Sequence, residues 1–375
     1  MNKIIRVLHT EWSDGWGGQE IRIISEINAM RSKGIKVFLA CRDHSNIKKK
    51  ALENNIQVFI LPFKGNHDYK TLLELRKIII KNSIDIVNTH SGKDTWVGGL
   101  AAKFSGIKFI RTRHLSNPIN SSRINFINEI ADFIFTTGEG VQDDMIKNNR
   151  INPDKIHSIP TGIDTYLFDN KKYNRDLCRN FFNIKQDEIA IGIIAVLRQF
   201  KRHDLFLQMA KSLIRQYPEK KIKFLIAGDG PQKDNIIDLI HKLDLDINVK
   251  LLGHIDQVPE LLSALDIFVL SSDSNEGVPQ SVMQALFMGK DVVATNSGST
   301  KDLLFDNNFQ LVETHSVFGL VEGVKYYLNN NLSEKNRVLI SDKFSLHFMS
   351  ERILGIYNYL LSPVYNCLLY TSPSP

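Results

Sequence analysis

Short apolar runs alternate with helix-length amphipathic segments along most of this chain of 375 residues. In the first half, apolar runs of strand length lie at 4–9, 36–40, 57–61, 84–90, 108–112 and 133–137. In the second half, they lie at 190–197, 222–228, 249–253, 266–272 and 291–295. Several runs carry Ile and Val on both alternations, as strands buried on both faces do. The pattern predicts an α/β fold with parallel sheets joined by crossover helices.

The chain is too long for one ordinary hydrophobic core, so we predict two domains of similar size. The stretch "IPTGIDTYLFDNKKYNRDLC" combines Pro, Gly, Asn and charges, as linkers do. Ligands bind outside the carboxyl ends of parallel strands, so two Rossmann-like, doubly wound domains that face each other would form a central cleft. The predicted parts are an N-terminal domain at 1–165, a linker at 166–185 and a C-terminal domain at 186–345.

Two segments follow the second predicted sheet. Residues 346–361 are amphipathic, and we expect a helix there that crosses back to the first domain. Residues 362–375 repeat Ser and Pro, which predicts a disordered tail. That tail also resembles translated sequencing-adaptor sequence, so we assign it no function.

Charge and cysteine usage narrow the class of protein. Residues 1–165 hold 24 Lys+Arg and 17 Asp+Glu, a net charge of +7, and the remainder of the chain holds 23 and 24, a net charge of −1. A basic half can attract an anionic surface or substrate, or can simply be a solvated face. Three widely spaced cysteines and no long apolar run suggest a cytoplasmic protein, and we expect no nucleic-acid partner.

Two glycines open the first predicted helix, in "GWGGQE". A glycine pair at a helix start lets backbone N–H groups approach a phosphate closely. The motif is not G-x-G-x-x-G, and no acidic residue ends the second strand at the dinucleotide spacing. Gly17 and Gly18 therefore favour a phosphate or sugar loop over a nicotinamide site, with a plain strand-to-helix turn as the alternative.

Other candidates follow later strands. Arg198 and Lys201 come just after a strand and suit a diphosphate, although exposed helix starts often carry such charges. Gly228 lies in "AGDGP", which taken alone reads as a tight turn. His114 follows a strand of the first half; it is either structural or a hydrogen-bonding group for a sugar or phosphate.

The stretch "SDSNEGVPQSVMQAL" joins a buried strand to a helix. Pro279 suits the first position of a helix, which would leave the next N–H groups free for a phosphate. Glu276 precedes that helix, and a carboxylate accepts hydrogen bonds from sugar hydroxyls. A sugar and a phosphate side by side indicate a nucleotide sugar.

Together these motifs resemble the retaining glycosyltransferases of family four, which have the GT-B fold. The likeness covers most of residues 1–361 and depends on "GWGGQE", "LRQFK", "AGDGP", "LLGHI" and "EGVPQSVMQALFMGKDVVAT". It implies catalytic roles for His114, Arg198, Lys201 and Glu276. It also implies donor-binding roles for Gly17, Gly18, Gln19, Gly228, Gly253, His254, Ile255, Gly277, Val278, Pro279, Gln280, Ser281 and Gln284.

One position departs from the family pattern. The second glutamate of the family motif usually binds the ribose hydroxyls, and here the residue is Gln284. An amide can accept from one hydroxyl and donate to the other, so ribose binding stays possible. We interpret the change as a subfamily trait.

The resemblance implies transfer of a sugar from a nucleoside-diphosphate sugar to an acceptor hydroxyl with retention, without a metal or other cofactor. The expected acceptor is a glycan or glycolipid of bacterial surface polysaccharide or lipopolysaccharide assembly. Basic segments of the first half could contact anionic lipid at the inner face of the cytoplasmic membrane. Two alternatives stay open, a sugar-nucleotide epimerase of similar fold and a non-catalytic nucleotide-sugar-binding protein.

Overall fold

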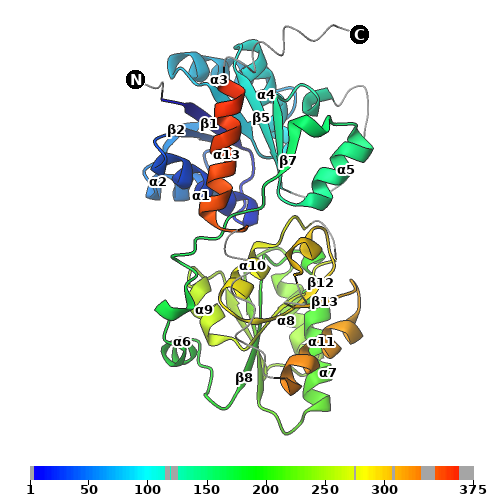
Figure 1. The fold of residues 1–375 in the computed structure, drawn as a ribbon. Helices are drawn as coiled ribbons and strands as arrows, with labels where there is room; N and C mark the ends of the chain where they lie inside the picture. Colours follow the sequence, from blue (N-terminus) through cyan, green and yellow to red (C-terminus); the bar gives the residue numbers. More distant parts are fainter. Residues whose placement is uncertain are drawn as a thin grey trace. The chain divides into compact units, whose positions relative to one another are not determined.

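The computed structural model describes residues 4–114, 119, 126–273, 276–305, 309–330 and 343–362. The chain forms two compact units, one built from the residues up to Gly162 together with those from Leu346 onward, and one from Ile163–Ser345 (Figure 1). Each unit is an α/β layer structure with one parallel sheet. The predicted fold class is therefore confirmed.

The first unit contains a seven-stranded sheet in the order β3-β2-β1-β4-β5-β6-β7, in which all neighbours are parallel. Its strands are β1 Arg6–Glu11, β2 Lys36–Cys41, β3 Gln57–Ile60, β4 Ile86–Thr89, β5 Lys108–Arg113, β6 Phe133–Thr136 and β7 Ile156–Ser158. Its helices are α1 Gly18–Ser32, α2 Asn46–Glu53, α3 Tyr69–Lys81, α4 Gly92–Phe104, α5 Glu139–Asn149 and α13 Leu346–Leu361.

The helices of the first unit cover both faces of its sheet. One buried cluster joins the strands to α1, α2 and α13, and another joins them to α3, α4 and α5. The last helix, α13, lies beside α1 (Figure 1). Its Tyr357 hydroxyl is buried and donates to Glu26 of α1 at 3.5 Å. The last helix is thus part of the first unit.

The second unit contains a six-stranded parallel sheet in the order β10-β9-β8-β11-β12-β13. Its strands are β8 Ile189–Ile194, β9 Ile222–Ala227, β10 Val249–Gly253, β11 Ile267–Leu270, β12 Asp291–Thr295 and β13 Gln310–Val312. Its helices are α6 Arg175–Phe181, α7 His203–Gln216, α8 Lys233–Lys242, α9 Val258–Ala264, α10 Gln280–Phe287 and α11 Val317–Asn329. Buried side chains join α6, α9 and α10 to one face, and α7, α8 and α11 to the other.

The segment predicted as a linker, 166–185, contains α6 and contributes to the core of the second unit. Cys178, Phe182 and Ile184 are buried in that core. The segment begins its helix where Asn174 accepts a hydrogen bond from Leu177 N at 3.0 Å, which satisfies one of the unpaired N–H groups of the first turn.

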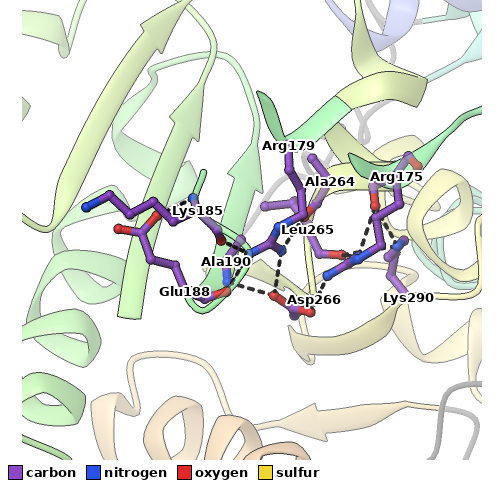
Figure 2. Close-up of polar contacts among 10 residues, drawn as sticks. Arg175, Arg179, Lys185, Glu188, Ala190, Ala264, Leu265, Asp266 and Lys290 are labelled. Carbon is purple, nitrogen blue, oxygen red and sulfur yellow. Dashed lines mark hydrogen bonds and ion pairs between the residues drawn. The ribbon is translucent and has the colours of Figure 1, made fainter. Parts of the chain in front are cut away.

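A cluster of cations fixes α6 to the amino ends of β8 and β11 (Figure 2). Asp266 accepts from Arg175 at 2.6 Å, from Arg179 at 3.3 Å and from the backbone N–H of Ala190 at 2.8 Å. Arg175 and Lys290 both donate to the carbonyls of residues 263 and 265, at the end of α9, where the helix dipole favours positive charge. These contacts lie at the edge of the sheet opposite the carboxyl ends, so we interpret the cluster as structural.

Arg179 is the buried centre of this cluster. Its side chain is 2% exposed, and it donates to the carbonyls of residues 185, 188 and 264 as well as to Asp266. Replacing it by Met would remove a hydrogen bond from three backbone carbonyls, of which that of Lys185 still accepts from the Glu188 N–H at 3.1 Å, and each buried group left without a partner costs about 1–3 kcal/mol. We expect Arg179→Met to lower the free energy of unfolding by about 3 kcal/mol in urea denaturation.

The matched control is Arg215→Met, because Arg215 is an exposed arginine of α7. That change should stay within about 0.5 kcal/mol of the unmodified protein. Equal unfolding midpoints for the two variants would show that the Arg179 cluster does not stabilise the fold.

Candidate active site

The strand order gives each sheet one switch point, where crossovers leave in opposite directions. In the second unit this point lies between β8 and β11, which pair in parallel. Ligands of doubly wound sheets bind outside the carboxyl ends of the strands at this point. The loop after β8 carries Arg198 and Lys201, and the loop after β11 carries Glu276.

The structure brings two of the predicted catalytic residues into direct contact. The Lys201 ammonium forms an ion pair with the Glu276 carboxylate, although the two residues are 75 positions apart. Their side chains are only 15% and 8% exposed, so the two charges are largely removed from water. Ser272 also donates to Glu276, at 2.6 Å. A charged pair of this kind can bind both an anionic group and hydroxyl groups of one ligand.

Further contacts fasten the loop after β8 to the loop after β11. The Ser271 hydroxyl is 2.9 Å from the carbonyls of Lys201 and Arg202, and the Asp273 N–H donates to the Phe200 carbonyl at 2.9 Å. Lys201 and Glu276 are therefore held in place by backbone contacts as well as by their own ion pair.

Arg202 lies beside the pair and was not predicted as a site residue. Its guanidinium binds Asp204 through two hydrogen bonds of 2.9 and 2.8 Å and contacts Asp273 at 3.2 Å. The hydrogen bonds to Asp204 raise the pKa of Arg202. Its backbone φ of 49° forms the bend between the short 3-10 helix Gln199–Lys201 and α7. Arg202 thus shapes the turn that presents Lys201.

Arg198 differs from Lys201 in its surroundings. It precedes the 3-10 helix, and its side chain is exposed. The segment "LRQFK" lies between a strand and a helix, as the sequence predicts. An exposed guanidinium at the carboxyl end of β8 can reach a bound anion and offers two parallel donors to it.

Glycines let neighbouring loops approach this site. A side chain at Gly228, whose φ is +143°, would place its Cβ 1.9 Å from the carbonyl oxygen of Ala195 in the loop after β8. Gly298 has a φ of +54° and leaves the same 1.9 Å to the carbonyl oxygen of Glu276. Gly228 was predicted from the sequence as a donor-binding residue, and in the structure it also supports the loop that carries Arg198. Gly298 was missed because its contact is 22 residues away in the chain.

The helix after Glu276 begins one residue later than predicted. Pro279 is the residue before α10 and not its first helical residue; its carbonyl accepts the first helical hydrogen bond, from Met283 N at 3.2 Å. Its φ of −71° with a ψ of 118° is extended, which places it outside the helix. The other predicted donor-binding residues here are buried or half-buried: Gly277, Val278, Gln280, Ser281 and Gln284.

The last residue of β10 and the two residues after it are three more predicted residues. The Gly253 carbonyl accepts from Gly228 N at 2.8 Å, which joins this loop to the one after β9. His254 is exposed and lies 3.7 Å from Asp256, and Ile255 is half-buried.

In the first unit, the predicted glycine pair opens α1. The Gly17 N–H donates to the Glu20 carboxylate at 2.9 Å, and Gly18 is the first residue of the helix. Gln19 donates to Glu11 at 2.5 Å. The start of this helix is therefore organised by two carboxylates, neither of which was predicted from the sequence.

His114 belongs to a group of three histidines, and this grouping was not predicted from the sequence. Its Nε2 lies 2.9 Å from Nδ1 of His90, and Nε2 of His90 lies 2.8 Å from Nδ1 of His9. The three rings are buried at the carboxyl ends of β5, β4 and β1. A signal was present in the sequence, because the runs "IVNTH" and "IRTRH" each end with histidine and the run "VLHTE" contains one.

Two buried carboxyl groups lie at the same edge of the first sheet. Burial, together with the neighbouring Asp94 and Glu20, raises the pKa of Glu11 well above its usual value. Burial also raises the pKa of Asp94, although Asp94 accepts hydrogen bonds from Thr10 Oγ1 at 2.5 Å and from the backbone of His90 at 3.0 Å. Asp94 thereby connects the end of β1 to the start of α4.

Within the described ranges, no group of three or more His, Cys, Asp or Glu side chains is arranged to hold a metal ion. The helices whose residues are described include none that is both long and apolar enough to cross a membrane.

Family models match both units of the chain. The model "Glycosyltransferase Family 4" matches residues 16–167, and the model "Glycosyl transferases group 1" matches residues 174–343. Together they cover nearly all of the two sheets. The family resemblance found in the motifs is confirmed.

Known proteins agree with this assignment. The chain is 24% identical to the UDP-Gal:alpha-D-GlcNAc-diphosphoundecaprenol alpha-1,3-galactosyltransferase of Escherichia coli, over 94% of this chain and 96% of the relative. It is 30% identical to the O-antigen biosynthesis glycosyltransferase WclY of Escherichia coli, over 56% and 57% of the two chains. The crystal structure of Anabaena Alr3699/HepE with UDP and glucose has the same fold, with a TM-score of 0.81 and 17% identity over 95% of this chain and 100% of that one.

Two parallel sheets, a charged switch point in the second unit and matches that span both units lead to one assignment: the chain belongs to the glycosyl transferases group 1 of glycosyltransferase family 4, with the GT-B fold, and it is a glycosyltransferase that uses a nucleotide sugar.

Proposed function

We propose that the chain transfers a sugar from a UDP-sugar to a hydroxyl of a glycan or glycolipid acceptor, with retention at the anomeric carbon, in the assembly of a bacterial surface polysaccharide. The observation that carries the proposal is the Lys201–Glu276 pair beside Arg198 at the switch point of the second sheet. The names of the Escherichia coli relatives and the UDP in the Anabaena structure support the donor and the pathway.

Arg198 and Lys201 would bind the donor diphosphate. When the bond from the anomeric carbon to the diphosphate breaks, its electron pair goes to the leaving phosphate oxygen. The cations of Arg198 and Lys201, together with the N-terminus of α10, would stabilise that charge. The acceptor oxygen then bonds to the anomeric carbon, and its proton passes to the leaving phosphate. This scheme needs no covalent nucleophile from the chain.

Glu276 would accept hydrogen bonds from hydroxyls of the transferred sugar while it stays paired with Lys201. The ion pair already present fits both roles, because Lys201 can contact the carboxylate and a phosphate with different N–H groups. His114 would lie beside the sugar, and the backbone of 277–281 would meet the sugar and phosphate.

The remaining donor contacts are assigned from the same family pattern. Gln284 would bind the ribose hydroxyls, and the segment 253–255 would lie beside the base. Gly17, Gly18 and Gln19 of the first unit would lie near the donor phosphates. Gly228 would lie near the donor while it supports the loop before Arg198.

The diphosphate role of Arg198 has a direct kinetic test. Removing one group that stabilises charge only in the transition state typically costs about 10²–10³ in kcat. We expect Arg198→Ala to lower kcat about 100-fold with a smaller change in the KM for the donor. The measurement is UDP release in the presence of acceptor, with Arg215→Ala of α7 as the control that keeps normal activity.

The same assay tests Gln284. A carboxylate at this position restores a charge-assisted bond to ribose, so Gln284→Glu should keep or lower the KM for the donor.

Each of the two variants has an outcome that would contradict its assignment. Normal turnover in Arg198→Ala would rule out the diphosphate assignment, and loss of donor binding in Gln284→Glu would rule out the ribose assignment.

We also propose that α3 contacts an anionic membrane surface, where lipid-linked acceptors lie. Its outer face carries Tyr69, Leu73 and Ile80, which are 72%, 54% and 67% exposed and follow helical spacing. Exposed lysines flank them at positions 70, 77 and 81. An amphipathic helix with apolar and basic residues on its free face can lie in the headgroup region. Of these lysines, Lys77 pairs with Glu74 of the same helix at 2.7 Å. In α2, two lysines pair with Asp43 and Glu53.

Vesicle sedimentation tests the α3 surface. The double variant Leu73→Glu, Ile80→Glu should lose most binding to phosphatidylcholine vesicles that contain phosphatidylglycerol, because it removes buried apolar area and adds repulsion. The matched control is Leu177→Glu, Phe181→Glu, two exposed apolar residues of α6 in the second unit. Equal sedimentation of both variants, or none for the unmodified protein, would remove the membrane proposal.

A further inference from the structure

Three buried histidines form a continuous hydrogen-bonded chain across the first sheet. His9 bonds to His90 at 2.8 Å through its Nδ1, and His90 bonds to His114 at 2.9 Å through its own Nδ1. The rings of His9 and His90 are stacked with centroids 5.1 Å apart, and those of His90 and His114 are 5.2 Å apart. Both ring nitrogens of His90 are thereby engaged, so its orientation is fixed from two sides.

The two hydrogen bonds link the tautomers of the three histidines. A neutral imidazole carries one N–H and one lone pair. If Nδ1 of His90 carries the hydrogen, it donates to His114, and His9 must donate to His90. If Nε2 of His90 carries it, His114 must donate to His90, which then donates to His9. Only these two arrangements form both hydrogen bonds with neutral rings, and in each all three histidines share one tautomer.

The surroundings keep the rings neutral. Burial lowers the pKa of His9 to about 3 and lowers those of His90 and His114 well below the usual value. Positive groups act in the same direction, since Arg22 lowers the pKa of both His90 and His114, and the arginines at 111 and 113 lower that of His114. A charged histidine in the chain would break the linkage of tautomers.

The buried end of the chain selects one of the two arrangements. Nε2 of His9 is buried and has no hydrogen-bond partner among the described residues. With Nε2–H tautomers this atom would be a donor without an acceptor, whereas with Nδ1–H tautomers it is only a bare lone pair. Buried N–H groups without a partner are rarer than under-satisfied acceptors. The Nδ1–H arrangement is therefore favoured, and the last hydrogen lies on Nδ1 of His114.

We infer that His9 and His90 are positioning residues that hold His114 in one ring orientation and in the Nδ1–H tautomer, so that it donates a hydrogen bond to an oxygen of the bound donor sugar. The inference rests on the proposed role of His114 beside that sugar. An N–H that is already aimed needs no reorganisation when charge develops, which is where such donors contribute to catalysis.

Nitrogen NMR of the full chain with ring-¹⁵N histidine measures the tautomers directly. A free neutral imidazole in water favours the Nε2–H form. The hydrogen-bonded histidines are predicted to show the Nδ1–H form instead, for His9, His90 and His114 alike, in the unmodified protein. In His9→Phe, His90 loses the donor on its Nε2, and His114 should shift toward Nε2–H although two hydrogen bonds separate it from the change. An Nε2–H form of His114 in the unmodified protein would overturn the inference without any variant.

The matched control is Thr112→Val, which removes the buried 2.9 Å hydrogen bond from Thr112 to Asn88 beside the chain. It changes stability at the same sheet edge and leaves the three histidines intact, so the His114 tautomer and kcat should stay as they are. An effect of Thr112→Val equal to that of His9→Phe would mean that general packing, and not the histidine chain, sets the tautomer.

Transfer kinetics separate this inference from the proposed function. His9→Phe should lower kcat about tenfold and leave the KM for the donor within about twofold, because the group lost acts in the transition state. An unchanged His114 tautomer in His9→Phe overturns the positioning inference and leaves the proposed function standing. A changed His114 tautomer with a normal kcat overturns the role of His114 beside the sugar. The three hydrogen-bonded histidines would then have no part in sugar transfer.

Discussion

Parallel strands impose the constraint on which this molecule depends. Each strand can return only through a crossover, so all strands of a sheet deliver their carboxyl ends to the same edge. In both sheets the order of strands reverses direction once, between β1 and β4 and between β8 and β11. Polar and charged side chains gather at these two points: three histidines and two carboxyl groups in the first unit, and the Lys201–Glu276 pair in the second.

The second unit carries two clusters of charged residues, one that stabilises the fold and one that is available to a ligand. At the amino ends of β8 and β11, Asp266 is saturated by Arg175, Arg179 and a backbone N–H, and the arginines also satisfy carbonyls at the end of α9 (Figure 2). At the carboxyl ends, Arg198 stays exposed beside the Lys201–Glu276 pair. The same residue types thus stabilise the fold at one edge and are available to a ligand at the other.

The sequence predicted most of the fold because buried parallel strands have a strong pattern. All eleven predicted strands are present. The strands β7 and β13 were missed because they have only three residues and lie at the sheet edges, where no long apolar run is needed. The start of α10 was predicted one residue early, since Pro279 suits both the first helical position and the residue before it.

The candidate site residues could be proposed one by one from the sequence, whereas their contacts could not. Arg198, Lys201 and Glu276 were proposed from the strand ends that they follow, whereas the Lys201–Glu276 pair spans 75 positions and has no local signal. The group of three histidines was not predicted because His90 and His9 belong to other strand segments, 24 and 105 positions from His114 in the chain. Such contacts depend on strand order, which periodicity does not provide.

The central claim is that the charged switch point of the second sheet supports transfer from a nucleotide sugar. The most direct measurement is NMR of a reaction with a panel of UDP-hexoses, with and without a lipid-linked sugar diphosphate as acceptor. The account predicts UDP release only when acceptor is present, and a product whose anomeric configuration matches that of the donor. An isomerised donor without acceptor would instead indicate an epimerase, and donor binding without turnover on any acceptor would indicate a binding protein.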